Sequence, residues 1–189
     1  SLLANITVNG VLNLQANKIF NIASYNLLLA STASITTGTS FSNTCYIHSA
    51  GQFGDGGITK VYTANTPFTF PVGCFSTNRP ATYAYTPAEI GFSSSPSTYG
   101  SLTVVPVGYE YPATTVKNQS LTFFWKVRST GFTGYSGKVT HTFVYAAADV
   151  NGSIANYIPS LYDLTANTWN NGVSGNINTG TRTITDWSS

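Results

Sequence analysis

Six carboxylates are the residues of this chain that offer acid–base chemistry, and they are scattered along the sequence. They are Asp55, Glu89, Glu110, Asp149, Asp163 and Asp186. A glycosidase needs two carboxylates about 5 to 9.5 Å apart, and none of the six lies in a recognisable acid–base motif. We therefore interpret the acids as structural or solvated groups and predict that the chain is not an enzyme.

Two histidines are the other candidates for proton transfer. His48 and His141 would serve a nucleophilic serine, but the sequence has no GxSxG motif. His141 alternates with Val139 and Phe143, which is the pattern of one face of a strand. A packed, hydrogen-bonded histidine is the better interpretation. We predict no catalytic residues and no cofactor.

The two cysteines, Cys45 and Cys74, are too far apart in sequence for a CxxC redox or zinc pair, and only His48 lies near them. We therefore predict no metal site. Two alternatives remain for the pair. In an exported protein the even count favours a disulfide, whereas the other possibility is two buried thiols in adjacent strands.

The composition excludes two classes of partner. Charged residues make up 7% of the chain, against roughly 25% in an ordinary soluble domain. The net charge of +2 comes from scattered residues without a basic run, so we predict no nucleic-acid binding. The strongest apolar run is the four residues at 27–30, far short of the roughly 18 needed to span a membrane, so we predict no membrane insertion.

The segment 68–92 shows what kind of elements the chain forms. Phe68, Phe70 and Val72 alternate with polar or turn residues, and Ala88 begins a second alternating run that ends at Phe92. A period of two is typical of half-buried strands. This segment therefore predicts two short strands around a proline-containing loop.

The second half of the chain contains the clearest strand patterns. In residues 121–128 the apolar side chains of one face include Trp125, which we interpret as a core anchor. Residues 139–145 repeat the pattern, and residues 181–185 predict a last strand. Turn residues recur about every ten positions and helix signals are nearly absent, which predicts an all-β antiparallel β-sandwich.

The N-terminal part differs in the spacing of its apolar residues. Short apolar pairs recur too closely for ordinary amphipathic helices, and Asn9-Gly10 favours a tight reversal. We predict a small stacked or meandering β segment over residues 1–44, packed on a β-sandwich module formed by residues 45–189. Gly-rich loops are expected at residues 51–57 and 93–101.

Aromatic residues make up 14% of the chain, and several tyrosines gather around its central loops. A tyrosine ring with its polar tip is suited to stacking on sugars or to contacting a protein. The alternative is that these residues belong to the core and surface of a tyrosine-rich sandwich. The candidate ligand contacts are Tyr83, Tyr85, Tyr99, Tyr109 and Tyr111.

Several motifs in a fixed order resemble a known family. They are Phe-Pro-Val-Gly at 70–73, Tyr-Thr-Pro-Ala-Glu-Ile at 85–90, Leu-Thr-Val-Val at 102–105, Phe-Trp-Lys-Val at 124–127, residues 139–152, Tyr-Asp at 162–163 and Trp-Asn-Asn at 169–171. In this order they resemble β-rich modules of large Bacteroidetes cell-surface adhesins exported by the type IX secretion system, including gliding adhesins. One departure is that Phe123-Phe124 stand where the family often has a polar or basic residue before the tryptophan.

The resemblance implies a secreted module at the cell surface. We therefore expect a noncatalytic extracellular structural or adhesive module of a large surface protein or fibre. A carbohydrate-binding module that contacts a surface glycan is the alternative. A third possibility is a self-assembling fibre subunit whose N-terminal strand pairs with another copy. The expected partners are neighbouring modules of the same polypeptide or copies of itself.

Overall fold

The computed structural model describes residues 1–75, 84–171, 176–178 and 183–185, and these residues are almost entirely β. Two short 3-10 segments, η2 (Ala147–Asp149) and η3 (Ile154–Asn156), interrupt the strands. The predicted all-β class is therefore confirmed. Within the described ranges there is no helix with the length and apolar character to cross a membrane.

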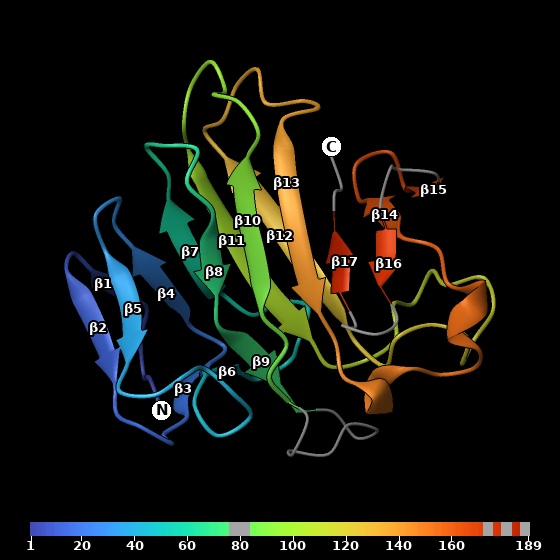
Figure 1. Cartoon of the computed structure of the whole chain (residues 1–189), viewed down its shortest axis with the longest axis horizontal. Helices are drawn as coiled ribbons and strands as arrows, with labels where there is room; N and C mark the ends of the chain where they lie inside the picture. Colours follow the sequence, from blue (N-terminus) through green and yellow to red (C-terminus); the bar gives the residue numbers. More distant parts are fainter. Residues whose placement is uncertain (76–83, 172–175, 179–182, 186–189) are drawn as a thin grey trace.

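The N-terminal part is a stack of parallel strands that winds through three sheets (Figure 1). The chain passes from one sheet to the next and then starts a new coil above the previous one. The first sheet begins with β1 (Ile6–Val8), β4 (Asn26–Leu29) and β7 (Gly57–Val61), the second holds β2 (Val11–Leu14) and β5 (Ser34–Thr37), and the third holds β3 (Phe20–Ala23), β6 (Ile47–Ser49) and β9 (Val72–Cys74).

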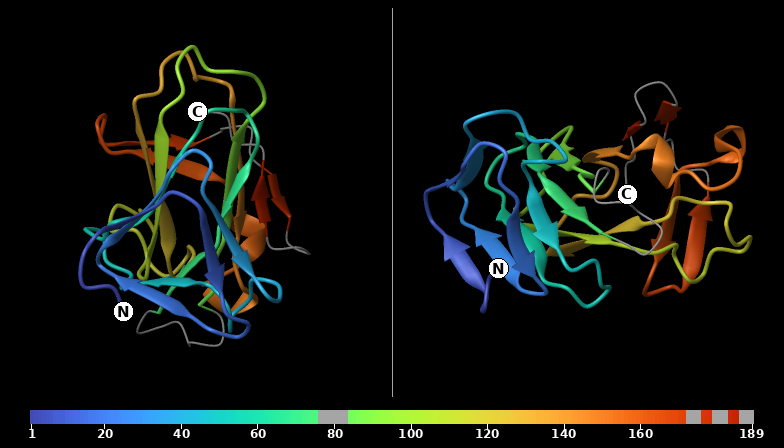
Figure 2. Two further views of the ribbon diagram at one scale, coloured as in Figure 1. Left: turned by 90° about the vertical axis from the view of Figure 1, so that its left-hand side faces the viewer. Right: turned by 90° about the horizontal axis from the view of Figure 1, so that it is seen from below.

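This stacking explains the closely spaced apolar pairs. The register places Ile6 beside Leu27 and Leu27 beside Ile58, so equivalent positions of successive coils form a column. Leu27 and Ile58 have no exposed surface. Each coil alone would leave its apolar side chains in water, so burial requires the next coil. The left panel of Figure 2, seen from the N-terminal side, shows these coils in the foreground.

The prediction of a tight reversal at Asn9-Gly10 is wrong. Neither residue has a positive φ, and β1 and β2 belong to different sheets and are not partners of one another. The pair forms a corner of the coil instead of a hairpin turn. Hairpin turns of the Asn-Gly kind need positive φ at both residues, and a corner does not.

The stacked coils and the sandwich share one sheet. β7 pairs with β4 in parallel on one side and with β11 (Ser101–Val107) antiparallel on the other, and β12 (Phe124–Thr130) follows β11. The order β1-β4-β7-β11-β12 therefore runs from one part of the molecule into the other. The division at residues 44 and 45 stays a prediction, and hydrogen bonds of this sheet cross it.

The second main sheet is antiparallel and faces the first (Figure 1). Its strands, in order, are β16 (Asn176–Asn178), β17 (Thr183–Thr185), β13 (Val139–Val144), β10 (Ala88–Phe92) and β8 (Phe68–Phe70). Pro71 separates β8 from β9, so the predicted strand at 68–72 becomes two strands in different sheets. A separate hairpin consists of β14 (Ser160–Asp163) and β15 (Thr168–Asn171).

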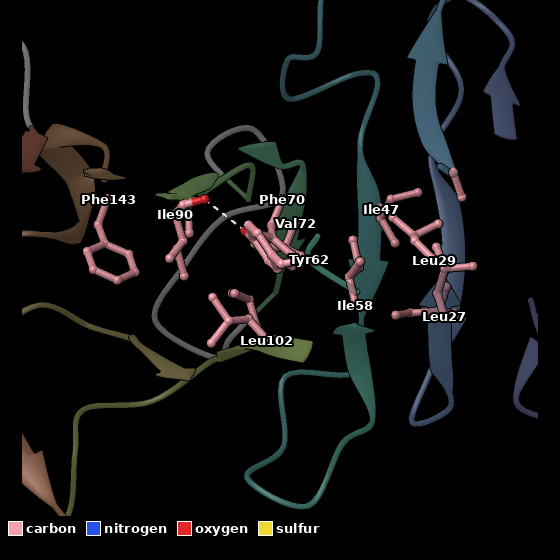
Figure 3. Close-up of a cluster of buried hydrophobic side chains, with 14 of the residues drawn as sticks. Leu27, Leu29, Ile47, Ile58, Tyr62, Phe70, Val72, Ile90, Leu102 and Phe143 are labelled. Atoms are coloured by element: carbon pink, nitrogen blue, oxygen red, sulfur yellow. Dashed lines mark hydrogen bonds between the residues drawn. The ribbon is translucent and has the colours of Figure 1, made fainter. Parts of the chain in front are cut away.

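One hydrophobic core extends through both parts. Aliphatic residues such as Leu29 and Ile47 fill the coils, and aromatic residues such as Phe70 and Phe143 join them between the two main sheets (Figure 3). The hydroxyl of Tyr62 donates a hydrogen bond of 2.8 Å to the Ile90 carbonyl across this core. The coils and the sandwich thus stabilise each other by burying a common apolar surface.

Candidate ligand-binding site

Aromatic rings from three segments that are distant in the sequence meet at strand β12. Tyr111, in the loop after β11, lies at their centre: its ring centroid is 4.9 Å from Phe124, 4.8 Å from Tyr162 and 5.6 Å from Trp169. Most of these rings meet edge to face, which is a favourable arrangement for aromatic quadrupoles. The group forms an aromatic cluster at the side of the sandwich.

The β14–β15 hairpin supplies two of these rings. Tyr162 and Trp169 are direct cross-strand partners, and their rings are 5.1 Å apart. The carboxylate of Asp163 accepts hydrogen bonds from the amides of Thr165 (2.7 Å) and Ala166 (3.0 Å), which closes the turn between the strands. The indole N–H of Trp169 donates to the Ala113 carbonyl at 3.0 Å and so ties the hairpin to the loop that carries Tyr111.

A cavity of about 440 Å³ lies between this hairpin and β12. Tyr111, Phe124, Tyr162 and Trp169 contribute to its walls, and apolar side chains predominate. Hydroxyl and amide groups also line it, from Thr114, Thr115, Gln119, Ser120 and Asn156. Its volume and its mixture of aromatic and polar groups fall in the range of small-ligand sites.

Lys126 brings a positive charge to the wall of this cavity. Its Nζ donates a hydrogen bond of 2.6 Å to the Phe53 carbonyl and lies 3.7 Å from the centre of the Phe53 ring. Burial lowers the pKa of Lys126, and the neighbouring Arg128 lowers it further, whereas Asp55 raises it. The ring of Phe53 stabilises the ammonium through a cation–π contact.

The structure disperses the tyrosines that the sequence placed together. Tyr83 lies outside the described residues. The ring of Tyr85 contacts Tyr46 at 6.1 Å, and the hydroxyl of Tyr99 donates to Asn65 Oδ1 at 2.8 Å, both away from the cavity.

Tyr109 and Tyr111 are the two candidates that belong to the aromatic cluster. Tyr111 lines the cavity, and Tyr109 contacts Phe124 with ring centroids 5.8 Å apart. Burial raises the pKa of Tyr111, and Tyr162 and Tyr109 add to this effect. The sequence prediction missed Phe53, Phe124, Tyr162 and Trp169; the alternation around the 163–168 turn was the available signal for the last two.

The acids serve local backbone and hydroxyl groups. Asp55 accepts from Ser49 Oγ at 2.8 Å and from the Gln52 amide at 3.0 Å, which holds the Gly-rich loop before β7. Asp149 accepts from the Ala146 amide at 2.8 Å at the start of η2.

The remaining described acids have partners of the same kind. Glu89 accepts from Thr69 Oγ1 at 3.0 Å, and Glu110 accepts from Ser120 Oγ at 2.6 Å. Asp163 closes the hairpin turn, and Asp186 lies outside the described residues. Each described carboxylate therefore has a local structural role.

The two histidines are buried in different sheets. His48, in β6, has its Nδ1 3.3 Å from the Tyr46 hydroxyl, and its ring contacts the tilted Phe75 ring with centroids 4.2 Å apart. Burial lowers its pKa, and Asp55 opposes this shift. His141, in β13, is 7% exposed and lies parallel to the Phe143 ring at 5.5 Å. Among the residues that the structure describes, no three His, Cys, Asp or Glu side chains gather as metal ligands would.

Cys45 and Cys74 are completely buried and are not joined by a disulfide in the structure. The predicted disulfide alternative is therefore not what the structure shows. Cys45 precedes β6, where its sulfur lies 3.0 Å from Thr37 Oγ1, and Cys74 ends β9, the neighbour of β6. Both positions fit small apolar side chains in the core of the coils.

Trp125, the predicted core anchor, is one of the residues that line the cavity. Its ring contacts Phe123 at 4.5 Å and Phe143 at 4.8 Å, and its indole N–H donates to the Thr86 carbonyl at 3.0 Å. It is partly buried against the core. The residue therefore links β12 to the segment before β10.

No protein-family model, no curated protein and no solved structure matches this chain.

Proposed function

We propose that the chain is a noncatalytic structural and adhesive module of a large surface protein or fibre, located outside the cell. The observation that carries this proposal is the sheet β1-β4-β7-β11-β12. Its hydrogen bonds run without interruption from β1 in the first coil to β12 in the sandwich. A spacer in a fibre must transmit force without separating into parts, and a shared sheet with a shared core suits this role.

The chemistry of the described side chains supports the same proposal. The carboxylates that would be candidates for acid–base catalysis are occupied by local amide and hydroxyl partners, as described for Asp55 and Glu110. The resemblance to Bacteroidetes surface adhesins in the order of motifs supports the extracellular location. Neighbouring modules of the same polypeptide are the expected partners.

Single-molecule stretching tests the mechanical role. The module is inserted between well-characterised reference domains and pulled from both ends. We expect one unfolding event that releases most of the chain, about 620 to 680 Å of extended length for 189 residues. Two separate events, with the coils and the sandwich unfolding independently, would contradict the proposal.

A carbohydrate-binding module is the second candidate function, and the cavity beside β12 is the observation that favours it. Aromatic walls with amide and hydroxyl groups are suited to the apolar face and the hydroxyl rim of a sugar. Trp125 and Trp169 both line the cavity, so their fluorescence reports on ligand entry. Titration with a broad panel of polysaccharides checks this function, and an unchanged emission throughout the panel argues against it.

A further inference from the structure

We propose that the cavity beside β12 binds a sugar unit that carries a carboxylate, as a uronic acid does in a polysaccharide, with Lys126 pairing with the carboxylate. This inference rests on the carbohydrate-binding candidate function and names its ligand class. It follows from the charges, the hydrogen-bond donors and the rings that the structure places around the cavity.

The charges around the cavity favour an anionic ligand. Lys126 is the charged side chain among the described residues of the lining, and Arg128 follows two positions later on the same strand. Two carboxylates lie nearby, and both are engaged: Asp55 is buried and accepts from Ser49 and Gln52, and Glu110 accepts from Ser120 and from the Asn118 amide. Neither carboxylate is among the described residues of the lining, so the charge that a ligand in the cavity would contact directly is the ammonium of Lys126.

The ammonium group of Lys126 has N–H donors available for a ligand. An ammonium group carries three N–H donors, and the Phe53 carbonyl takes one of them at 2.6 Å. The contact with the Phe53 ring fixes the side chain beside the cavity, because the ring lies 3.7 Å from Nζ. A ligand carboxylate would thus meet a prepositioned ammonium, which reduces the entropy lost on binding. Charge-assisted hydrogen bonds of this type are the strong ones.

The rest of the lining distinguishes a sugar from a simple anion. The Tyr111, Tyr162 and Trp169 rings offer apolar surfaces on which the C–H face of a pyranose can rest. Gln119 and Asn156 add amide groups that match ring hydroxyls in both directions of hydrogen bonding. A flat anion without an apolar face would leave these rings uncovered.

The test uses one sugar backbone with and without its charge. Oligogalacturonate and its methyl ester differ only in whether the carboxylate is ionised or esterified. They are titrated into the intact protein and followed by tryptophan fluorescence and calorimetry. We expect the acid to bind at least about tenfold more tightly than the ester, as one charge-assisted hydrogen bond implies. Equal binding of the two ligands would overturn the role of Lys126 and leave carbohydrate binding standing.

A matched pair of variants locates the effect. Lys126→Gln should abolish the preference for the acid, whereas Lys18→Gln, which removes the same charge from an exposed position in the coils, should retain it. Retention of the preference in Lys126→Gln refutes the proposal. Because the comparison of acid and ester in the unaltered protein needs no variant, a misfolded Lys126→Gln does not prevent the test.

Polyglutamate serves as the control for charge alone. Tight binding to polyglutamate, at the level of the oligogalacturonate, would show that the surface attracts any polyanion and would refute a sugar site. Failure of every glycan to bind would remove both the inference and the carbohydrate-binding function, and it would leave the mechanical role untouched.

Discussion

The ammonium group of Lys60 donates a hydrogen bond of 2.7 Å to the Ala33 carbonyl, in the corner between β4 and β5. The carbonyls of Ala30 and Ser31 accept from the same Nζ at 2.8 and 2.7 Å. Lys60 belongs to β7, in the next coil, and is only 8% exposed. One side chain therefore satisfies three carbonyls that converge at a bend of the neighbouring coil. Burial lowers the pKa of this ammonium.

Replacing Lys60 should destabilise the protein strongly. Lys60→Met keeps the length of the side chain but leaves three carbonyls without this donor, so we expect the free energy of unfolding to fall by about 3 kcal/mol or more. Urea unfolding measures the change. Lys18→Met, at an exposed site, is the control and should stay within about 0.5 kcal/mol of the original protein. An equal effect of both changes would show that the three hydrogen bonds are dispensable.

Alkaline pH should weaken the fold in a defined window. Burial raises the pKa of Tyr85 to about 12, with the Cys45 thiol adding to the shift, from the ordinary 10.0. Burial also raises the pKa of Tyr62, and Glu89 contributes. An unfolded tyrosine loses its proton first, so stability is fully present below pH 10 and declines as the pH rises to about 12.

The size of the alkaline effect can be assigned with one variant. Tyr85 should account for about 2 to 3 kcal/mol of the loss between pH 10 and pH 12. Tyr85→Phe removes this ionisation, so its free energy of unfolding should decline less steeply over the same interval. Denaturant unfolding at pH 10 and at pH 12 gives the decline of each protein. Parallel decline of the variant and the original protein would contradict the assignment.

The cysteines should remain reduced and protected. Because Cys45 and Cys74 are fully buried, we expect iodoacetamide to modify neither in the folded protein and both after unfolding in urea without reductant. Intact mass spectrometry counts the adducts. A protein that accepts no label in urea until it is reduced would contain the disulfide that the structure lacks.

Self-assembly through the first strand makes a further prediction. The Val8 carbonyl accepts from the Ala30 amide at 3.0 Å, so Val8 faces β4. Successive residues of a strand direct their backbone groups to opposite sides, which leaves the Thr7 N–H at the outer edge of the sheet. If copies pair along this edge, Thr7→Pro should abolish assembly in light scattering, whereas Thr7→Val should retain it. Unchanged assembly in Thr7→Pro would exclude this edge as the contact.

The sequence predicted individual strands better than their partners. The alternation at 121–128 and 139–145 indicated β12 and β13, because each has one side facing the core. The parallel pairing of β1, β4 and β7 was not predictable in the same way, since parallel and antiparallel strands share a period of two. The Asn9-Gly10 pair was misleading for this reason: its residues suit a hairpin, but the stacked coil needs a corner there.

The cavity was harder to foresee than the sheets. Its rings come from positions as far apart as Tyr111, Phe124 and Trp169, and their meeting depends on how the β14–β15 hairpin docks on the loop after β11. The tyrosines that are close in sequence are instead carried apart by intervening strands. The clustering of tyrosines in the sequence therefore predicted that the site is aromatic, but it did not predict which aromatic residues line the cavity.

The double pairing of β7 bears on how this protein can be shortened. A fragment starting at residue 45 would lack β4. The backbone of β7 would then form an unpaired sheet edge exposed to water, and Ile58 would lose its neighbour Leu27. Exposed edge strands of this kind pair with other chains and promote aggregation. Anyone excising the C-terminal half for expression should therefore retain Asn26–Leu29 with it.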